Sequence, residues 1–341
     1  MLEVRIKKSV GQFCLDCEFL VENEVFALLG ASGSGKSMTL KCIAGIETPD
    51  YGRIAVDGHV LFDSERKINV APQKRRIGYL FEDYALFPHM TVRQNIMSGM
   101  GKRPDVNAFK QYISRFFLQG LEEAYPRQLS GGQKQRAAMA RMLAAEPDVL
   151  LLDEPFSALD SHLSWQIEQQ TRAVLEEWRK PTVFVSHSRD EVFRLCERAA
   201  CIHQGKIEEI ASVRELFLHP ATKTAAVLTG CKNIAEAYRL DSSHISAPEW
   251  GVTLLVPVTA ISVSAVGIRS HHLKPEGSGE NYFPVHTYHI LEDAFEWNLS
   301  FRTKEDGAWI QWSVSKTEWS PAEGVPEGFW VSQGDILLFG E

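Results

Sequence analysis

The sequence predicts an α/β domain with a mainly parallel sheet, followed by a small all-β domain. Apolar runs at residues 24–29, 149–152 and 182–185 alternate with helix-like segments through the first two-thirds of the chain, which favours parallel strands covered on both faces. From about residue 230, short β-branched and aromatic runs are separated by Gly, Pro, Ser and Asn, as in small barrels and sandwiches. The length of 341 residues fits two domains of about 100–200 residues.

Two stretches between these runs have a distinct character. A strand-poor, helical insertion is predicted between about residues 95 and 145, and a helical connector interrupted at Pro220 is predicted over residues 212–229.

Residues 250–268 form an apolar stretch that could be mistaken for a membrane span. It contains Pro257, several Ser and Thr, and many β-branched residues, so two strands with a break near the proline are predicted instead. The chain is therefore expected to be soluble.

The composition narrows the class of protein. Hydrophobic residues make up 44% and charged residues 23% of the chain, so a packed core is predicted and wholesale disorder is excluded. Acidic residues outnumber basic ones, 44 to 36, which argues against a nucleic-acid partner because that needs a basic face. The first residues have no apolar core for a signal peptide. Cys14 and Cys17 should face opposite sides of a strand, so neither a metal site nor a redox pair is expected there.

The strongest functional motif is the glycine-rich segment 30–37, GASGSGKS, which follows a predicted strand and precedes a predicted helix. A tight turn around a phosphate needs inward-pointing backbone N–H groups and few side chains, which glycines allow. The helix start adds a favourable partial charge for an anion. Lys36 would reach the β- and γ-phosphates of a nucleotide, and the Ser37 hydroxyl would ligate Mg²⁺. The predicted phosphate-binding residues are Gly30, Ala31, Ser32, Gly33, Ser34, Gly35, Lys36 and Ser37.

A second motif places two carboxylates, Asp153 and Glu154, directly after the apolar run 149–152. The carboxyl end of a strand in a parallel sheet is where such folds bind ligands. Asp153 would hold Mg²⁺, and Glu154 would orient or deprotonate an attacking water. His187 follows the apolar run 182–185 and is placed to contact a γ-phosphate, although a lone histidine is otherwise a structural residue.

A third motif, LSGGQ at residues 129–133, precedes the helical sequence KQRAAMARMLAAEPD. Two glycines at a helix start provide a second place where backbone donors meet a phosphate. Because the chain already holds one phosphate loop, this second cradle indicates a binding site shared between two chains. The residues assigned to it are Ser130, Gly131, Gly132 and Gln133.

In this order, GASGSGKS, LSGGQ, VLLLDE, the SALD sequence at 157–160 and His187 resemble the nucleotide-binding subunits of ATP-binding cassette (ABC) transporters. The resemblance covers the first two-thirds of the chain. It implies an α/β P-loop NTPase cassette over residues 1–229, with a helical subdomain at about 83–146. Residues 230–341 resemble a small, all-β, barrel-like regulatory domain of the oligoanion-binding (TOBE/MOP-like) type.

The resemblance implies an ATPase that works as a head-to-tail homodimer, with ATP and Mg²⁺ held between the phosphate loop of one subunit and the LSGGQ segment of the other. Asp160 resembles the loop residue that crosses the dimer interface, and His187 the switch histidine. Phe13 lies where the family places an aromatic that stacks on adenine; an ordinary strand aromatic is the alternative. Catalysis would come mostly from positioning and from charge neutralisation by Lys36, Mg²⁺ and the opposing LSGGQ segment.

One position departs from the family pattern. The family's glutamine that approaches Mg²⁺ and the attacking water falls at Glu82, in the sequence YLFEDY. A carboxylate can still ligate Mg²⁺, but it adds charge beside Asp153, Glu154 and the γ-phosphate, and it cannot donate a hydrogen bond. Slower turnover or altered metal dependence is expected. A nucleotide-regulated binding module with weak hydrolysis is the alternative.

The segment 85–92, ALFPHMTV, is similar to the groove with which this family contacts the coupling helix of a membrane subunit. A plain core cluster of Leu86, Phe87 and Met90 is the alternative. The resemblance places the chain at the cytoplasmic face of the membrane, in contact with permease subunits at about residues 82–92. An extracytoplasmic solute-binding protein is an indirect partner.

One cassette followed by a small β domain resembles importer ATPases for oxyanions, iron, polyamines and sugars. Residues 71–92 and 229–234 are most similar to the molybdate and sulfate branch, so molybdate, or tungstate or sulfate, is the expected solute. Arg269 is a candidate anion contact. His271 and His272 are either metal ligands or surface residues. A non-transport ABC ATPase is a further alternative, although the sequence has neither tandem cassettes nor long coiled-coil insertions.

Overall fold

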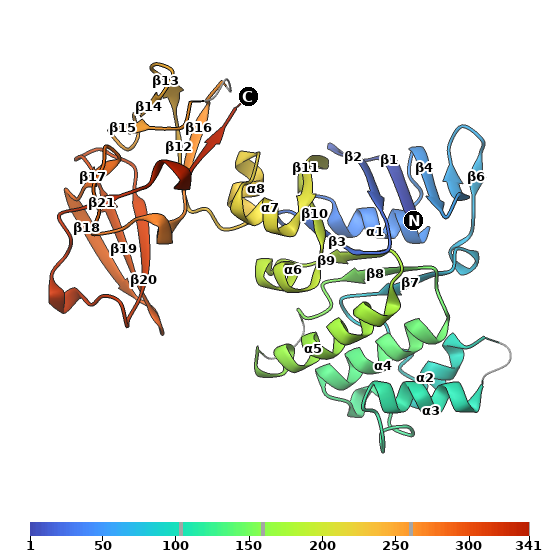
Figure 1. The fold of residues 1–341 in the computed structure, drawn as a ribbon. Helices are drawn as coiled ribbons and strands as arrows, with labels where there is room; N and C mark the ends of the chain where they lie inside the picture. Colours follow the sequence, from blue (N-terminus) through green and yellow to red (C-terminus); the bar gives the residue numbers. More distant parts are fainter. Residues whose placement is uncertain (102–104, 158–160, 259–261, 341) are drawn as a thin grey trace. The chain divides into compact units, whose positions relative to one another are not determined.

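The structure is a computed structural model that describes residues 1–101, 105–157, 161–258 and 262–340, without the side chains of 161–164 and 166. The chain divides into two compact units (Figure 1), unit 1 over Met1–Val213 and unit 2 over Arg214–Glu341. The sequence analysis places the boundary later, at residues 229–230, and so assigns the helical connector to the cassette. In the structure that connector belongs almost entirely to unit 2.

Unit 1 is built on an eleven-stranded mixed sheet (Figure 1). Its strands are β1 (Leu2–Val10), β2 (Phe13–Val21), β3 (Val25–Leu29), β4 (Tyr51–Val56), β5 (His59–Asp63), β6 (Ile68–Asn69), β7 (Ile77–Leu80), β8 (Val149–Asp153), β9 (Thr182–Val185), β10 (Arg198–His203) and β11 (Lys206–Ser212). In space they follow the order β6-β5-β4-β1-β2-β11-β10-β3-β9-β8-β7. Strands β7, β8, β9, β3 and β10 pair in parallel, which confirms the predicted parallel sheet, and antiparallel strands extend it.

The central strands are buried on both faces, as their unbroken apolar sequences predict. Every residue of β3, β8 and β9 is buried. The helix α1 (Lys36–Ala44) follows β3. Its Leu40 and Ile43 lie in one buried cluster with Leu28, Leu151 and Val183 of these strands. The packing therefore fixes both ends of the loop that joins β3 to α1.

A helical segment lies between β7 and β8, as predicted. It contains α2 (Val92–Gly99), α3 (Val106–Arg115) and α4 (Gly131–Ala144), and α4 contacts α2, α3 and the edge strand β7. The helices α5 (Ser161–Trp178) and α6 (Arg189–Leu195) follow β8 and β9 (Figure 1). Short 3₁₀ helices of this unit are η1 (Pro72–Lys74) and η2 (Pro126–Gln128).

Two short helices, α7 (Val213–Leu218) and α8 (Lys223–Leu228), flank Pro220 at the start of unit 2. The strands that follow are β12 (Asn233–Glu236), β13 (Tyr238–Arg239), β14 (His244–Ala247), β15 (Val252–Leu255), β16 (Ala265–Ile268), β17 (Tyr282–Pro284), β18 (Thr287–Glu292), β19 (Glu296–Arg302), β20 (Ile310–Ser315), β21 (Gly328–Trp330) and β22 (Ile336–Phe339), with the 3₁₀ helices η3 (Ser270–His272), η4 (Pro321–Glu323) and η5 (Gln333–Asp335). They form small antiparallel sheets, β12-β16-β22, β13-β14-β15, β17-β21 and β18-β19-β20. The predicted interruption at Pro220 and the predicted all-β character are both confirmed.

Aromatic side chains form the core of unit 2. Trp250, Phe283, Phe301 and Phe329 are fully buried, and the Phe301 and Phe329 rings lie 4.8 Å apart. The stretch 250–268 contains β15 and β16, which confirms the two predicted strands. Across the described residues, no helix has the length and apolar character needed to cross a membrane.

The cysteine pair at the start of the chain lies on β2, and the strand alternates as predicted. Cys14 is exposed and Cys17 is buried, so their side chains point to opposite faces of the sheet. The described part of the chain contains no cluster of three or more His, Cys, Asp or Glu that could hold a metal ion.

Candidate active site

The phosphate loop, residues 30–35, connects β3 to α1, as predicted. Gly35, just before the first residue of α1, has φ 107°, a backbone conformation that favours glycine. A Cβ at Gly30 would lie 2.6 Å from the carbonyl oxygen of Ile202 on β10, which leaves no room for a side chain. Backbone geometry thus explains why glycine occupies both positions.

Lys36 lies inside this loop and is only 4% exposed. Its Nζ donates hydrogen bonds to the carbonyl oxygens of Gly30 (2.8 Å) and Ala31 (2.9 Å). Burial lowers the pKa of Lys36, while the negative charges of Glu154 and Asp153 act in the opposite direction. The structure therefore holds an amine inside the predicted phosphate loop and close to two carboxylates.

Asp153, the last residue of β8, is buried, and both oxygens of its carboxylate accept a hydrogen bond. The Ser37 hydroxyl donates to Oδ1 (3.0 Å), and the Tyr79 hydroxyl donates to Oδ2 (2.8 Å). Burial and then the nearby Asp153 charge raise the pKa of Tyr79, so its hydroxyl remains a donor. The sequence analysis missed Tyr79. The available signal was the pairing of its strand with the strand that ends in Asp153.

Glu154 and His187 lie at the same edge of the sheet and contact each other, with His187 Nε2 2.5 Å from Glu154 Oε1. Glu154 has φ 47°, a conformation that costs on the order of 1–3 kcal/mol in a non-glycine residue. The Ser157 hydroxyl donates to the Glu154 carbonyl oxygen (2.9 Å) and helps to hold this backbone. The two side chains assigned to water activation and γ-phosphate contact are therefore neighbours.

A pocket of about 670 Å³ brings the predicted residues together. It is lined by Lys8, Val10, Phe13, Ser32, Gly33, Gly35, Lys36, Ser37, Met38, Lys41, Glu47, Glu154 and His187. Phe13, at the start of β2, lies against the loop, because a Cβ at Gly35 would be 3.1 Å from Phe13 Cζ. Gly30, Ala31, Ser34 and Asp153 are not among the lining residues, but Ser37, which contacts Asp153, is. The lining thus includes the flat apolar ring of Phe13, the ammonium group of Lys36 and the carboxylate of Glu154.

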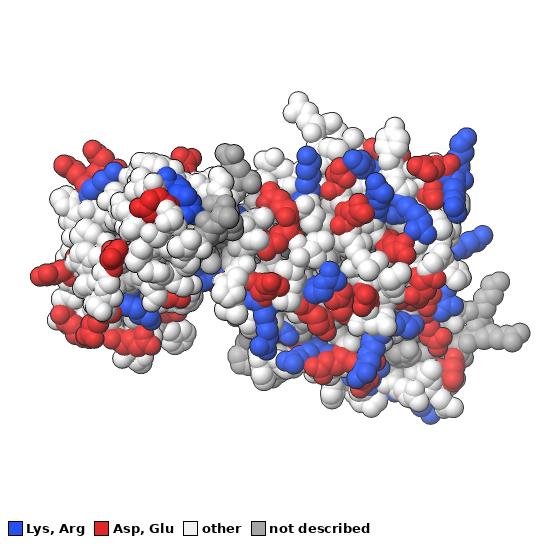
Figure 2. Space-filling view, turned by 45° about the horizontal axis from the view of Figure 1, so that its top comes forward, with Lys and Arg blue, Asp and Glu red and all other residues white. Residues whose placement is uncertain are grey.

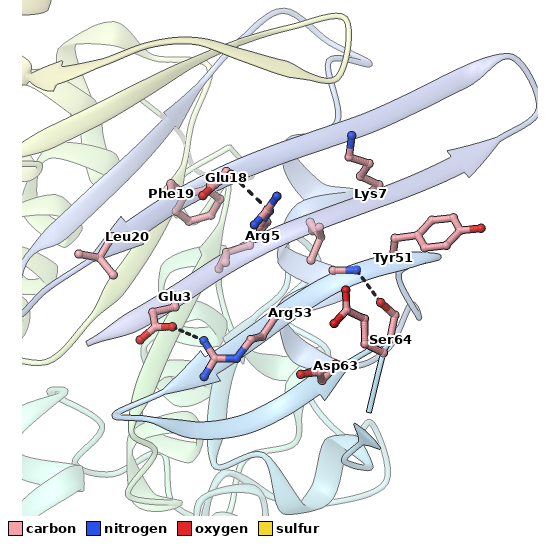
Figure 3. A pocket seen from close by; sticks show the side chains of 14 residues that line it. Glu3, Arg5, Lys7, Glu18, Phe19, Leu20, Tyr51, Arg53, Asp63 and Ser64 are labelled. Atoms are coloured by element: carbon pink, nitrogen blue, oxygen red, sulfur yellow. Dashed lines mark hydrogen bonds and ion pairs between the residues drawn. The ribbon is translucent and has the colours of Figure 1, made fainter. Parts of the chain in front are cut away.

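A second pocket of unit 1, about 710 Å³, lies over β1, β2, β4 and β5 (Figure 3). Basic side chains in it form ion pairs with neighbouring carboxylates: Arg5 with Glu18 (3.5 Å), Lys7 with Asp16 (2.7 Å) and Arg53 with Glu3 (2.6 Å). Its lining contains none of the residues that the sequence motifs single out. Figure 2 shows the same mixing of basic and acidic side chains over the face in view. The motif-lined pocket is therefore the candidate active site.

The LSGGQ segment does not line this pocket. Ser130 caps α4, where its hydroxyl accepts from the Gln133 N–H (3.4 Å) and its own N–H donates to Gln133 Oε1 (2.9 Å). Gly132 is buried, and a Cβ there would lie 2.4 Å from Ile167 Cδ1. Glu82 is exposed and is likewise not among the lining residues. Asp160 lies outside the described residues.

The segment that follows Glu82 is tied to α4 by one arginine. Arg141 donates to the carbonyl oxygens of Ala85 (2.7 Å) and Tyr84 (3.2 Å), and its guanidinium lies 5.1 Å from the centre of the Phe87 ring. Tyr84 and Ala85 have φ 62° and 43°, both in the left-handed region. Phe87 is exposed, whereas Leu86 and Met90 are half-buried. The sequence analysis missed Arg141, whose distance of more than fifty residues from this turn gives no local signal.

Arg269, the candidate anion contact, has partners within the protein, so the anion contact there stays a prediction. Its guanidinium is buried and donates to the carbonyl oxygens of Phe217 and Thr229 (3.0 Å), and also to the Thr229 hydroxyl (3.2 Å). These carbonyls lie at the ends of α7 and α8, so Arg269 joins the two helices to β16. The two histidines that follow Arg269 have different surroundings. Burial is the main cause that lowers the pKa of His271, whereas Nδ1 of His272 lies 3.4 Å from Oδ1 of Asp335.

A pocket of about 710 Å³ in unit 2 has an acidic lining. Its carboxylates come from Glu276, Glu296, Glu318, Glu323 and Glu327. Lys274, His271, Trp312 and Trp319 also line it. Because carboxylates outnumber basic groups, this pocket repels rather than attracts an oxyanion.

Comparison with known proteins identifies the family. A family model described as "ABC transporter" matches residues 19–157 of this chain. The sulfate/thiosulfate import ATP-binding protein CysA of Caulobacter vibrioides is 35% identical over 304 residues, which cover 85% of this chain and 82% of that protein. This chain belongs to the ABC transporter family. Its relatives are ATP-binding proteins of importers, so the chain is an ABC importer ATPase, as the sequence analysis predicts.

Further relatives of this ABC ATPase extend the comparison. The molybdenum import ATP-binding protein ModC of Rhodospirillum rubrum is 36% identical over 223 residues, 64% of this chain and 60% of that protein. A solved dimer of a bacterial ABC transporter cassette matches with a TM-score of 0.54 and 28% identity, over 63% of this chain and 99% of that chain. These matches confirm the ABC cassette fold.

Proposed function

We propose that this chain is the ATP-hydrolysing subunit of an oxyanion importer, with sulfate or thiosulfate as the first candidate solute. The choice of solute rests on how much of this chain aligns with each kind of relative. Among the sulfate/thiosulfate relatives, that of Caulobacter vibrioides aligns with 85% of this chain, which is more than unit 1 contains, so its similarity extends into unit 2. Five others align with 62–79% of the chain. The molybdenum relative aligns with 64% of the chain, about the length of unit 1 alone.

Molybdate is the second candidate, and it is the solute that the sequence analysis favours. Its support is the identity of 36–37% with two molybdenum import proteins, which is close to that of the sulfate/thiosulfate relative. Unit 2 adds no support for either anion, since Arg269 caps two helices and the pocket of unit 2 is acidic. The oxyanion is therefore proposed only as the solute that the transporter carries. Unit 2 is proposed as a regulatory β domain, and no oxyanion is assigned to it as a ligand.

The residues of the pocket fit ATP with Mg²⁺. Ser32, Gly33, Gly35, Lys36 and Ser37 of the loop line the pocket, and the φ of 76° at Gly33 and 107° at Gly35 gives the loop the tight backbone turn that suits a phosphate. Ser37 and Asp153 offer the hydroxyl and carboxylate oxygens that Mg²⁺ prefers. Glu82 is proposed as a further ligand when its loop approaches the site. Charge neutralisation on the β- and γ-phosphates is the chemistry that Mg²⁺ supplies when bound.

Four side chains of the pocket have a proposed role in nucleotide binding or hydrolysis: Phe13, Lys36, Glu154 and His187. Phe13 stacks on the adenine, and the backbone N–H groups of the loop bind the phosphates. Lys36, held by two loop carbonyls, stabilises the charge that develops on the γ-phosphate oxygens. Glu154 orients the attacking water and takes its proton, while His187, 2.5 Å from Glu154, contacts the γ-phosphate.

The site is completed by a second copy of the chain. Ser130–Gln133 do not share the pocket with the phosphate loop within one chain, which fits a head-to-tail dimer in which LSGGQ of one subunit faces the loop of the other and Asp160 crosses the interface. A related cassette has been solved as a dimer in two structures, one of them bound to ADP and Pi. Binding of ATP would close such a dimer, and hydrolysis would reopen it.

The segment 82–92 is proposed as the contact with membrane permease subunits. Phe87 is exposed there, and Arg141 ties the turn before it to the helix that begins at LSGGQ. Closure of the dimer would move α4, and Arg141 would pass that movement to the permease. The chain would then sit peripherally at the cytoplasmic face of the membrane, with a solute-binding protein on the other side.

Uptake by cells of the source organism tests the function and the solute together. Deleting the gene should abolish uptake of radiolabelled sulfate, leave molybdate uptake intact, and be reversed by the parent gene but not by Lys36→Ala. Lys110→Ala, a change of an exposed lysine on α3, should restore uptake fully. Loss of molybdate uptake alone would move the assignment to the second candidate. Unchanged uptake of both anions would contradict an oxyanion importer.

A further inference from the structure

We propose that Tyr79 is a positioning residue for ATP hydrolysis, because its hydroxyl sets the orientation of the Asp153 carboxylate toward the nucleotide-bound Mg²⁺. The inference rests on the proposed function, in which Ser37 and Asp153 hold Mg²⁺. Tyr79 does not line the pocket. It acts through Asp153 and has no contact with the reacting atoms.

The two oxygens of the Asp153 carboxylate are held from opposite elements. Ser37, on α1, donates to Oδ1 at 3.0 Å, and Tyr79, on β7, donates to Oδ2 at 2.8 Å. A carboxylate held at both oxygens cannot rotate about its terminal bond without breaking a hydrogen bond. Ser37 can donate to Asp153 and still offer its oxygen lone pairs to a metal. Both donors can therefore stay with Asp153 when the metal is bound, and Tyr79, which does not line the pocket, is the one that has no proposed ligand role of its own.

Tyr79 is well placed to impose this orientation because its own position is fixed. Strand β7 pairs in parallel with β8, with Tyr79 opposite Leu151 and Leu80 opposite Leu152. The Tyr79 ring stacks on the Phe81 ring, with centres 4.1 Å apart and planes 24° from parallel. Phe81 directly precedes Glu82. Tyr79, which holds Asp153, therefore also contacts the segment that carries Glu82, the proposed further metal ligand.

Replacing Tyr79 by phenylalanine would remove one hydroxyl and leave the ring and its stacking in place. Oδ2 of Asp153 would then be a buried carboxylate oxygen that has lost its donor, and the carboxylate would turn to find another. Loss of such an outer partner commonly weakens metal binding by about 10–100-fold. The contacts of the loop with phosphate and of Phe13 with adenine do not involve Tyr79, so nucleotide affinity without metal should not change.

The test compares nucleotide affinity with and without metal in the full chain. The dissociation constant of a fluorescent, non-hydrolysable ATP analogue is measured in EDTA and again at saturating Mg²⁺, for the parent, Tyr79→Phe and Tyr112→Phe. Tyr112 is the matched control, because its hydroxyl donates to the Leu143 carbonyl oxygen on α4 (3.1 Å), away from the pocket. In Tyr79→Phe, the tightening caused by Mg²⁺ should shrink by about 10-fold, with the EDTA value unchanged. In Tyr112→Phe, both values should equal those of the parent.

Two results would overturn the inference. One is a Tyr79→Phe variant whose affinity tightens with Mg²⁺ as much as that of the parent. The other is an equal loss of affinity in EDTA and in Mg²⁺, which would show a general disturbance of the loop. A parent chain that binds no nucleotide would overturn the proposed function, and this inference with it, so the two failures are distinguishable.

Discussion

Each unit of the molecule buries a basic side chain that donates to backbone carbonyls, but the two have different surroundings. Lys36 of unit 1 is 4% exposed and Arg269 of unit 2 is 8% exposed. Lys36 holds carbonyls of a loop that lines a pocket, next to the carboxylates of Asp153 and Glu154. Arg269 holds carbonyls at the ends of two helices and does not line the pocket of unit 2. The function of a buried basic residue is thus indicated by whether the groups that it holds line a pocket.

The largest effect is expected at the functional member of the pair. Lys36→Ala removes the charge proposed to face the β- and γ-phosphates, so kcat/KM for ATP should fall by at least about 100-fold, as for loss of one preorganised donor. Steady-state phosphate release by the full chain measures this. Lys110→Ala on α3 is the control and should keep the parent rate. Parent-like turnover in Lys36→Ala would mean that the loop does not bind the phosphates.

Arg269→Ala should affect stability and not activity. It leaves the carbonyl oxygens of Phe217 and Thr229 without their donor, and the free energy of unfolding of unit 2 should fall by about 2–4 kcal/mol. Tryptophan fluorescence during urea unfolding reports on this unit, because six of the eight tryptophans lie in it. Lys232→Ala, at an exposed position, should change stability by no more than about 0.5 kcal/mol. Unaltered stability with weakened anion binding would support the anion-contact assignment.

The two units also differ in how far the sequence predicts them. In unit 1, the strands at 149–153 and 182–185 were predicted almost to the residue, because strands buried on both faces have unbroken apolar sequences. The phosphate loop was predicted because its residues are consecutive and its glycines answer a backbone requirement. In unit 2 the strand character was predicted, but the pairing of β16 with β12 on one side and β22 on the other was not, because it joins segments far apart in the chain.

Single side chains were the weakest part of the prediction for the same reason. Tyr79 contacts Asp153 across two strands, and Arg141 contacts Ala85 from another helix. Neither contact has a local sequence pattern. Arg269 was assigned to an anion from its sequence context alone, and only the fold shows that the ends of α7 and α8 occupy its donors. A motif predicts a site when its chemistry is contained in consecutive residues.

Glu82→Gln should have a smaller effect within unit 1. Glu82 is exposed, so removing its negative charge, proposed to lie near the γ-phosphate, should change the activation free energy by roughly 1 kcal/mol, the value for two unit charges about 4 Å apart in water, or about five-fold in rate. Turnover should rise and its dependence on Mg²⁺ should shift. Rates measured across a range of free Mg²⁺ check this, with Glu122→Gln, also outside the pocket lining, as control. Identical curves for parent and Glu82→Gln would place Glu82 outside the reaction.

The smallest effect is expected for the addition of an oxyanion to the chain, which should not change the fluorescence of unit 2. Titrating the full chain with sulfate, molybdate and tungstate should leave tryptophan fluorescence unchanged up to about 1 mM, a limit of roughly 4 kcal/mol of binding energy. Trp312 and Trp319 line the acidic pocket and would report a bound ligand. Saturable quenching at micromolar anion would show an oxyanion site in unit 2 that neither Arg269 nor this pocket explains.

Hydrolysis by Glu154 is the claim on which the importer assignment depends most. Phosphate release from ATP should require Mg²⁺ in the parent and should fall by about 100-fold or more in Glu154→Gln, while the affinity for ATP is retained. A Glu154→Gln variant that turns over ATP at the parent rate would contradict the role of this carboxylate at the end of β8.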